Sequence, residues 1–178
     1  MFLKTLHQVS FIYGKLENIN NSLLEKECLK SYHNKKSFSD DTTDSRNEDL
    51  IISKSKEFDK IISGIQSQFQ QQHNQKLILT EYWAQVHGKN ESTNLHDHVN
   101  CFDIKNSPVY SGVYYVKVPK NSGKIVFQYP INKYNQYQRY WYETFQGDFL
   151  IFPSTLDHFV TKNESNDYRI AISFNFKI

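Results

Sequence analysis

Three histidines in the second half of the chain have the residue type and spacing of a metal site. His96 and His98 flank a single aspartate, and His158 follows a later apolar run. Successive side chains of a strand point to opposite faces, so His96 and His98 are expected on one face and Asp97 on the other. Two imidazoles from one strand and a third from a later strand can hold one metal ion. A lone histidine is more often a packed or surface residue, but this set, followed by Arg169, favours a metal site.

Short strands are expected to position these histidines. After Gln75, runs of β-branched and aromatic residues alternate with turn residues such as Gly123 and Gly147. The expected strands cover residues 77–87, 109–118, 124–129, 140–146, 148–153, 158–161 and 168–177. Many short strands without intervening helices are typical of a sandwich, a barrel or a jelly roll.

The N-terminal segment, residues 1–75, has a different pattern. An early strand is expected within 2–14, and Ser22 with Glu25 fits a capping box that begins a first helix. A polar loop follows over 34–50. A second helix is predicted by apolar residues at helical spacing, which are expected to pack against the sheet. These residues are Phe58, Ile61, Ile62, Ile65 and Phe69.

The composition indicates a single domain over 1–178, with the β core at 76–178. The net charge of +2 provides no electrostatic footprint for nucleic acid or for an anionic membrane. Cys28 and Cys101 are far apart and are expected to be reduced thiols. No apolar run is long enough for a signal peptide or a membrane span, so a cytoplasmic location is expected.

Five stretches between Trp83 and the C-terminus form a distinctive set through their order and spacing. They are His96-x-His98, Ser-Gly-Val-Tyr-Tyr-Val at 111–116, Gly-Asp-Phe-Leu-Ile-Phe-Pro-Ser at 147–154, His158, and 169–175. Together they resemble the 2-oxoglutarate and Fe(II)-dependent oxygenases, and more closely a small microbial and phage subgroup of them. The resemblance covers a little over half of the chain. It implies a mainly β fold, a double-stranded β-helix or jelly roll, with the two N-terminal helices packed on it.

The resemblance also implies that His96, His98 and His158 bind Fe(II). The usual triad of such enzymes is two histidines and a carboxylate. His98 stands where the wider superfamily has Asp or Glu, and Asp97 points away by strand alternation. Three neutral imidazoles leave the ferrous site more positive by one charge, which a 2-oxoglutarate dianion can offset.

For the co-substrate 2-oxoglutarate, the resemblance implies an anchor at Arg169. Its guanidinium fork matches the distal carboxylate bidentately. Tyr115 either donates its hydroxyl to the same carboxylate or packs in the core, and the two interpretations are evenly weighted. Asn175 is expected to line the pocket. Ala171 stands where the family often has a serine, so one carboxylate contact is expected to be missing.

Strand alternation places Arg169 on the same face as Ala171 and Ser173. That face is expected to be the pocket interior. Ile170 and Ile172 would then lie on the opposite face, under the N-terminal helices.

The expected reaction is oxidation, in the form of hydroxylation, of an unidentified substrate with release of succinate and CO2. A small molecule, a peptide and a protein side chain all remain open as substrate, as does oligomerisation. The Tyr-rich segment 131–142 either borders the pocket entrance or forms a solvated hairpin.

Two alternatives to the oxygenase function remain. One is a three-His zinc or other cupin-like metalloenzyme, and the other is a non-catalytic jelly-roll binding module. Arg169 disfavours the zinc enzyme, because hydrolysis needs no carboxylate anchor there.

Overall fold

The structure is a computed structural model, and it describes residues 9–36, 52–131 and 136–178. The expected polar loop 34–50 lies mostly outside these ranges, since the first helix continues to Lys36. Residues 2–8 of the expected early strand lie outside them as well.

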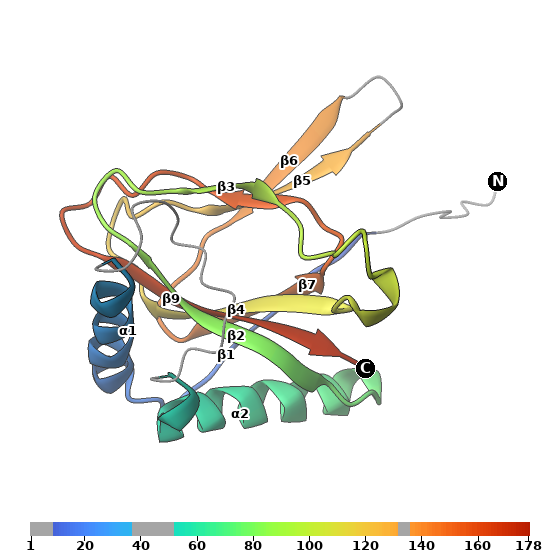
Figure 1. Cartoon of the computed structure of the whole chain (residues 1–178), viewed down its shortest axis with the longest axis horizontal. Coiled ribbons are helices and arrows are strands. Elements are labelled where there is room, and N and C mark those ends of the chain that lie inside the picture. The colour runs from blue at the N-terminus through green and yellow to red at the C-terminus, as the bar shows by residue number, and fades with distance from the viewer. Residues whose placement is uncertain (1–8, 37–51, 132–135) are drawn as a thin grey trace.

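Two antiparallel sheets face each other and form the double-stranded β-helix, as the sequence predicted (Figure 1). The five-stranded sheet has the order β1 (Ile12–Lys15), β7 (Asp148–Pro153), β4 (Tyr110–Lys117), β9 (Arg169–Lys177) and β2 (Ile78–His87). The four-stranded sheet has the order β3 (Thr93–His96), β8 (His158–Val160), β5 (Ile125–Pro130) and β6 (Tyr137–Tyr142). A buried apolar cluster fills part of the space between the sheets, and it includes Val113, Tyr115, Phe127, Leu150, Phe152 and Ala171.

Helices cover the outer face of the five-stranded sheet (Figure 1). They are α1 (Asn21–Lys36) and α2 (Lys56–His73), accompanied by the short 3-10 turns η1 (Ile52–Lys54) and η2 (Ile104–Asn106) elsewhere in the chain. The five apolar residues predicted on one face of α2 are all buried. They pack with Ile170, Ile172, Phe174 and Phe176 of β9. No helix in the described part of the chain is both long and apolar enough to cross a membrane.

The capping box predicted at Ser22 is wrong. Helix α1 begins at Asn21, and its N-cap is Asn20, two residues before Ser22; the Asn20 side chain accepts a hydrogen bond from the Leu23 N–H at 3.1 Å. Asn is as good an N-cap as Ser, and local sequence does not separate the two. Glu25 instead pairs with Lys117 of β4 at 2.9 Å, a contact between distant parts of the chain.

The strand predicted at 140–146 is displaced towards the N-terminus. β6 ends at Tyr142, where its pairing with Ile125 of β5 also ends. A tight turn follows, in which the Phe145 N–H donates to the Asp148 side chain at 2.8 Å and the Asp148 N–H donates back to the Phe145 carbonyl at 3.1 Å. Residues 143–147 are therefore a turn into β7, with Gly147 at a positive φ of 88°.

Gly112 of β4 sits where no side chain fits. A Cβ added there would lie 2.7 Å from the Leu150 carbonyl oxygen of the neighbouring strand and would also clash with the Phe174 ring. We expect Gly112→Ala to lower the free energy of unfolding by about 1–3 kcal/mol, the usual cost of overpacking. Urea denaturation measures this effect.

Gly88→Ala is the matched control, because its added Cβ would come no closer than 3.4 Å to any neighbour, which is ordinary contact. Equal stability of the two variants would contradict the packing argument.

Candidate active site

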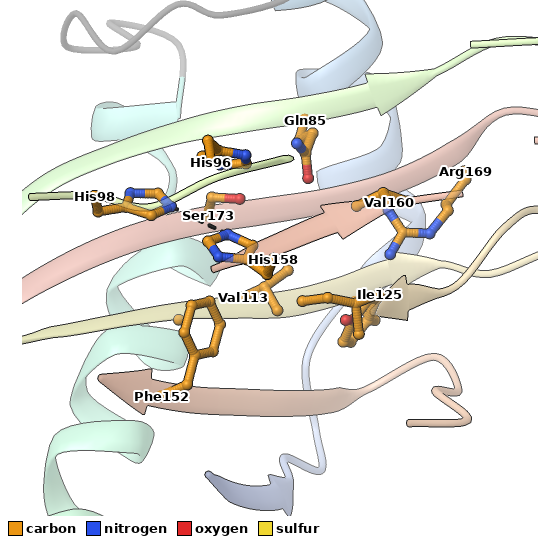
Figure 2. A pocket seen from close by; sticks show the side chains of 12 residues that line it. Gln85, His96, His98, Val113, Ile125, Phe152, His158, Val160, Arg169 and Ser173 are labelled. Atoms are coloured by element: carbon orange, nitrogen blue, oxygen red, sulfur yellow. Dashed lines mark hydrogen bonds between the residues drawn. The ribbon is translucent and has the colours of Figure 1, made fainter. Parts of the chain in front are cut away.

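A pocket lies between the two sheets, and it is lined by side chains from both (Figure 2). Its lining residues include Gln85, His96, His98, Val113, Tyr115, Ile125, Phe152, His158, Val160, Arg169 and Ser173. The histidines gather on one side of it, and Arg169 lies apart from them (Figure 2). The pocket therefore joins the expected metal ligands and the expected carboxylate anchor.

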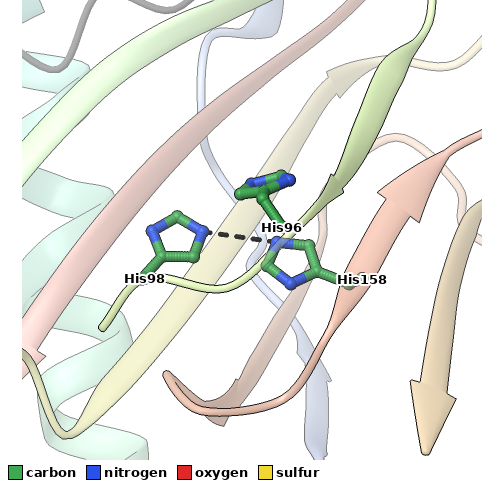
Figure 3. Close-up of side chains that lie close together, drawn as sticks. All are labelled: His96, His98 and His158. Atoms are coloured by element: carbon green, nitrogen blue, oxygen red, sulfur yellow. Dashed lines mark hydrogen bonds between the residues drawn. The ribbon is translucent and has the colours of Figure 1, made fainter. Parts of the chain in front are cut away.

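The three imidazoles converge on one point (Figure 3). One nitrogen from each of His96, His98 and His158 lies within 4.8 Å of the others. Nε2 of His98 is 3.3 Å from Nε2 of His158. Two nitrogens bound ~2.0–2.1 Å from one ion, at tetrahedral or octahedral angles, lie roughly 2.8–3.4 Å apart. The spacing of this pair therefore fits two ligands of a single metal ion.

Backbone carbonyls fix the proton positions on two of the rings. Nδ1 of His96 is 2.8 Å from the Asn94 carbonyl oxygen, and Nδ1 of His158 is 2.9 Å from that of Leu156. A carbonyl only accepts, so each Nδ1 carries the proton and each Nε2 keeps its lone pair for a metal. Burial, and to a smaller extent the nearby His96, lowers the pKa of His158 to about 4. The ring is thus neutral near pH 7, as a metal ligand must be.

His98 reaches the site for a different reason than strand alternation. β3 ends at His96, and His98 lies in the irregular segment that follows. Its N–H donates to the Ser154 carbonyl at 2.9 Å, and the Trp83 ring stacks on its imidazole with centroids 5.6 Å apart. Asp97 turns away, and its carboxylate accepts the Val99 N–H at 3.0 Å. Among the described residues, no carboxylate joins the three-histidine group.

Arg169 is buried in the pocket wall, with 1% of its surface exposed. Along β9 it alternates with Ile170 and Ile172, which face the helices. Arg169 and Ser173 line the pocket as predicted, whereas Ala171 packs in the apolar cluster between the sheets. No carboxylate among the described residues pairs with its guanidinium, and its Nε has no hydrogen-bond partner there. The pocket thus holds a cation with no counter-ion from the described chain.

Tyr115 lies beside that cation. The guanidinium carbon is 5.2 Å from the centre of the Tyr115 ring. The hydroxyl is fully buried, it has no hydrogen-bond partner of normal geometry among the described residues, and the positive charge of Arg169 is close enough to act on it. Burial raises the pKa of Tyr115 to about 12, so its hydroxyl stays protonated and able to donate. Packing and donation are both compatible with this position.

His87 is a neighbour of the site that the sequence reasoning missed. It is the partner of Arg169 across the β2–β9 pairing, and its Nδ1 is 3.5 Å from Nη1 of Arg169. Burial, followed by the charge of Arg169, lowers the pKa of His87 to about 4. The sequence does show a histidine at the end of a predicted strand. Its pairing with Arg169, however, depends on the register between β2 and β9, which the sequence does not reveal.

Asn175 is not among the residues that line this pocket. It lies further along β9 in a buried polar cluster, where its amide accepts from Ser111 Oγ at 2.7 Å and donates to Glu81 at 2.5 Å. Ser111 Oγ is also 2.8 Å from Ser154 Oγ. The cluster connects β2, β4 and β9 with Ser154, which follows β7 and whose carbonyl accepts from the His98 N–H.

The Tyr-rich segment forms the hairpin of β5 and β6, apart from residues 132–135, which lie outside the described ranges. Tyr137, Tyr140 and Trp141 are exposed. Phe11, near the N-terminus, packs against Tyr140 with ring centroids 5.7 Å apart. None of the described residues of this segment lines the pocket, which favours the solvated hairpin of the two earlier interpretations.

Fold and site together define a jelly-roll oxygenase of the non-haem iron class. Residues 81–175 match the family model described as "Putative 2OG-Fe(II) oxygenase", which covers more than half of the chain. The chain belongs to this family of 2-oxoglutarate and Fe(II)-dependent oxygenases. No curated protein matches the sequence.

Solved structures with the same fold are similar to this chain at low sequence identity. The carbocyclase SnoK of nogalamycin biosynthesis, which is alpha-ketoglutarate dependent, has a TM-score of 0.68 at 12% identity, covering 94% of this chain and 79% of SnoK. A prolyl-4-hydroxylase from Pseudomonas putida has a TM-score of 0.64 at 12% identity, covering 95% and 88% of the two chains. The epimerase SnoN in complex with Fe3+ and alpha-ketoglutarate has a TM-score of 0.66 at 10% identity, covering 94% and 78%.

The protein is therefore an oxidoreductase whose cofactors are Fe(II) and 2-oxoglutarate. The donor set fits this assignment, because three imidazoles converge and a buried cation stands in the same pocket. Family membership also favours the oxygenase over the zinc enzyme and the non-catalytic binding module.

The convergence of the three imidazole rings predicts that each is needed for tight metal binding. We expect His158→Ala to lower Fe(II) affinity more than about 100-fold, which exceeds the usual effect of residues outside the coordination sphere. Equilibrium dialysis without oxygen measures it. His73→Ala is the control, because His73 is an exposed histidine at the end of α2. Fe(II) affinity that is equal in the two variants would contradict a three-histidine site.

The lowered pKa of His87 predicts that the folded protein loses stability in acid. Its pKa is about 4 in the folded protein, against 6.5 as its ordinary value. The folded state thus binds fewer protons in this range, and stability present above pH 6.5 is lost as the pH falls towards 4. Between pH 7.5 and 5.0, we expect the metal-free protein to lose about 2 kcal/mol through this residue.

Urea denaturation of metal-free protein at the two pH values measures this loss. His87→Asn should show a pH dependence that is smaller by the same amount, because Asn does not titrate. Parallel pH profiles for the two proteins would exclude His87 as the titrating group.

Proposed function

We propose that the protein hydroxylates a carbon–hydrogen bond of its substrate, with His96, His98 and His158 as the iron ligands and Arg169 as the anchor for 2-oxoglutarate. One observation carries this assignment. The converged imidazoles share a pocket with a buried guanidinium that has no carboxylate partner among the described residues.

The energetics of burial support an anionic ligand at Arg169. A buried charge is costly unless it is paired, and Arg cannot relieve the cost by releasing its proton. The distal carboxylate of 2-oxoglutarate would supply the missing counter-ion, and a guanidinium binds a carboxylate through two parallel hydrogen bonds. The protonated hydroxyl of Tyr115, whose ring lies beside the guanidinium, would donate to the same carboxylate.

The remaining pocket residues orient groups and exclude water. When bound, Fe(II) and 2-oxoglutarate supply the oxidising chemistry, and the co-substrate leaves as succinate and carbon dioxide. The carbonyls of Asn94 and Leu156 hold the imidazoles of His96 and His158 with their Nε2 atoms directed to the site. The buried side chains of Val113 and Phe152 make part of the wall apolar, which keeps water from the reacting groups.

Charge balance explains how three neutral ligands can suffice. In the usual triad one carboxylate offsets part of the metal charge. Here the ligand set is neutral, and Arg169 adds a further positive charge to the pocket. The two carboxylates of 2-oxoglutarate would supply two negative charges to this pocket, which would offset the charge of Arg169 and part of the charge of the metal.

The whole of 1–178 is proposed to act as one oxygenase domain. β1 extends the five-stranded sheet by pairing with β7, and both helices pack on its outer face. By their names, the structural neighbours include a carbocyclase of nogalamycin biosynthesis and a prolyl-4-hydroxylase. These names support either a small molecule or a peptide side chain as the substrate.

The anchor assignment predicts the effect of removing one cation. Loss of one partner of a buried charge pair costs ~3–5 kcal/mol. We therefore expect Arg169→Ala to weaken 2-oxoglutarate binding by at least about two orders of magnitude, while Fe(II) still binds. Anaerobic titration of the Fe(II) protein with 2-oxoglutarate, followed by its visible charge-transfer absorption, measures this loss.

Arg139→Ala is the matched control. Arg139 is exposed on β6, where it packs over the Phe159 ring and donates to Gln128. It should bind 2-oxoglutarate like the unchanged protein. Unaltered binding in Arg169→Ala would remove the main support for the proposed anchor.

A further inference from the structure

We propose that His87 is a positioning residue for the co-substrate, which fixes the guanidinium of Arg169 through a neutral hydrogen-bond acceptor and leaves its charge to the ligand. This inference rests on the proposed function of Arg169. His87 is not among the residues that line the pocket, so it acts through Arg169 and not by touching a ligand.

The backbone places the two residues together. His87 and Arg169 are direct partners in the antiparallel pairing of β2 with β9. Both side chains are buried, each with 1% of its surface exposed. Nη1 of Arg169 lies 3.5 Å from Nδ1 of His87. At 3.5 Å the contact is at the upper limit of hydrogen-bond length and is weak by itself, so the burial of both side chains also keeps them in place.

The hydrogen-bond directions follow from the chemistry of the groups. A guanidinium only donates, so Nδ1 of His87 must accept and its proton must lie on Nε2. Nε2 is 2.8 Å from Thr93 Oγ1, which accepts that proton. Gln85 Nε2 donates to the same oxygen at 3.0 Å. Thr93 Oγ1 thereby uses both of its lone pairs, and the orientation of the imidazole is fixed from β3 and β2.

The neutrality of the acceptor is the essential property. A carboxylate at position 87 would pair with Arg169 and compete with the distal carboxylate of 2-oxoglutarate. A neutral imidazole holds the guanidinium without offsetting its charge, and burial next to Arg169 keeps the pKa of His87 near 4. The pocket thus retains a full positive charge whose orientation is already set before the ligand arrives.

Three variants test the role. His87→Leu removes the acceptor, and we expect the 2-oxoglutarate dissociation constant to rise roughly tenfold. His87→Asn places a neutral oxygen near the position of Nδ1, and we expect a rise below about threefold. His87→Asp supplies a competing negative charge, and we expect a larger rise than in His87→Leu. The readout is calorimetric titration of 2-oxoglutarate into the Fe(II) protein without oxygen.

A purely structural role would change other properties as well. We expect Fe(II) affinity and the turnover rate at saturating 2-oxoglutarate to stay within about twofold in His87→Leu, because the metal ligands are untouched. If His87→Leu does not fold, Thr93→Val is the substitute, since it removes the oxygen that orients the imidazole and should raise the same dissociation constant.

The outcomes separate this inference from the proposed function. A rise in the order Asn, Leu, Asp, with Fe(II) binding unchanged, supports the positioning role. If Arg169→Ala loses 2-oxoglutarate binding while His87→Leu binds it normally, the inference is overturned and the anchor stands. If Arg169→Ala itself binds 2-oxoglutarate normally, the proposed function fails first. Equal losses of 2-oxoglutarate affinity, Fe(II) affinity and turnover in His87→Leu would reduce His87 to a structural residue.

Discussion

An unpaired positive charge in the interior is the constraint on which much of this structure depends. Arg169 is buried at the wall of the pocket with no carboxylate partner in the described chain. The neighbours of its guanidinium are a neutral imidazole and the face of an aromatic ring, His87 and Tyr115. Both stabilise a cation weakly and leave it able to bind an anion. A protein that buries a charge in this way is less stable than one that pairs it, and the cost is offset only when the ligand binds.

The three-histidine group, proposed above as the iron site, brings three electron-pair donors together without an ion pair. The rings of His98 and His158 are parallel within 5°, and their Nε2 atoms are 3.3 Å apart. Groups outside the three-histidine cluster hold the rings in place. Backbone carbonyls accept from His96 and His158, and His98 contacts the Trp83 ring and the Ser154 carbonyl. The site is therefore organised by groups that do not themselves bind metal, as is usual for a well-ordered coordination sphere.

Local sequence was sufficient for most of the strands, for the buried face of α2 and for the side of β9 that Arg169 occupies, but it displaced β6 and gave no separate range for β3. Each correct prediction follows from a hydrophobic period of two or of 3.6 residues. His98 was correctly predicted to lie near His96 and His158, but strand alternation was an incomplete reason. Its position depends on a backbone hydrogen bond to Ser154, which is distant in sequence. The part played by His87 was not predictable, since it depends on which residue of β2 faces Arg169. Register between strands ninety residues apart is a global property, and no local pattern encodes it.

The residues of β9 alternate between the helix-covered face of the sheet and the interior between the sheets. Its even-numbered residues, Ile170 to Phe176, pack under the helices, and its odd-numbered residues from Arg169 face the interior between the sheets. Among the odd-numbered residues, Arg169 and Ser173 line the pocket, whereas Ala171 and Asn175 are packed in buried clusters. Substitution at a packed position of either parity alters how many molecules fold, whereas substitution at Ser173 alters the pocket wall. In a mutational library, changes in ligand recognition with normal cellular abundance would therefore concentrate at Ser173 on this strand.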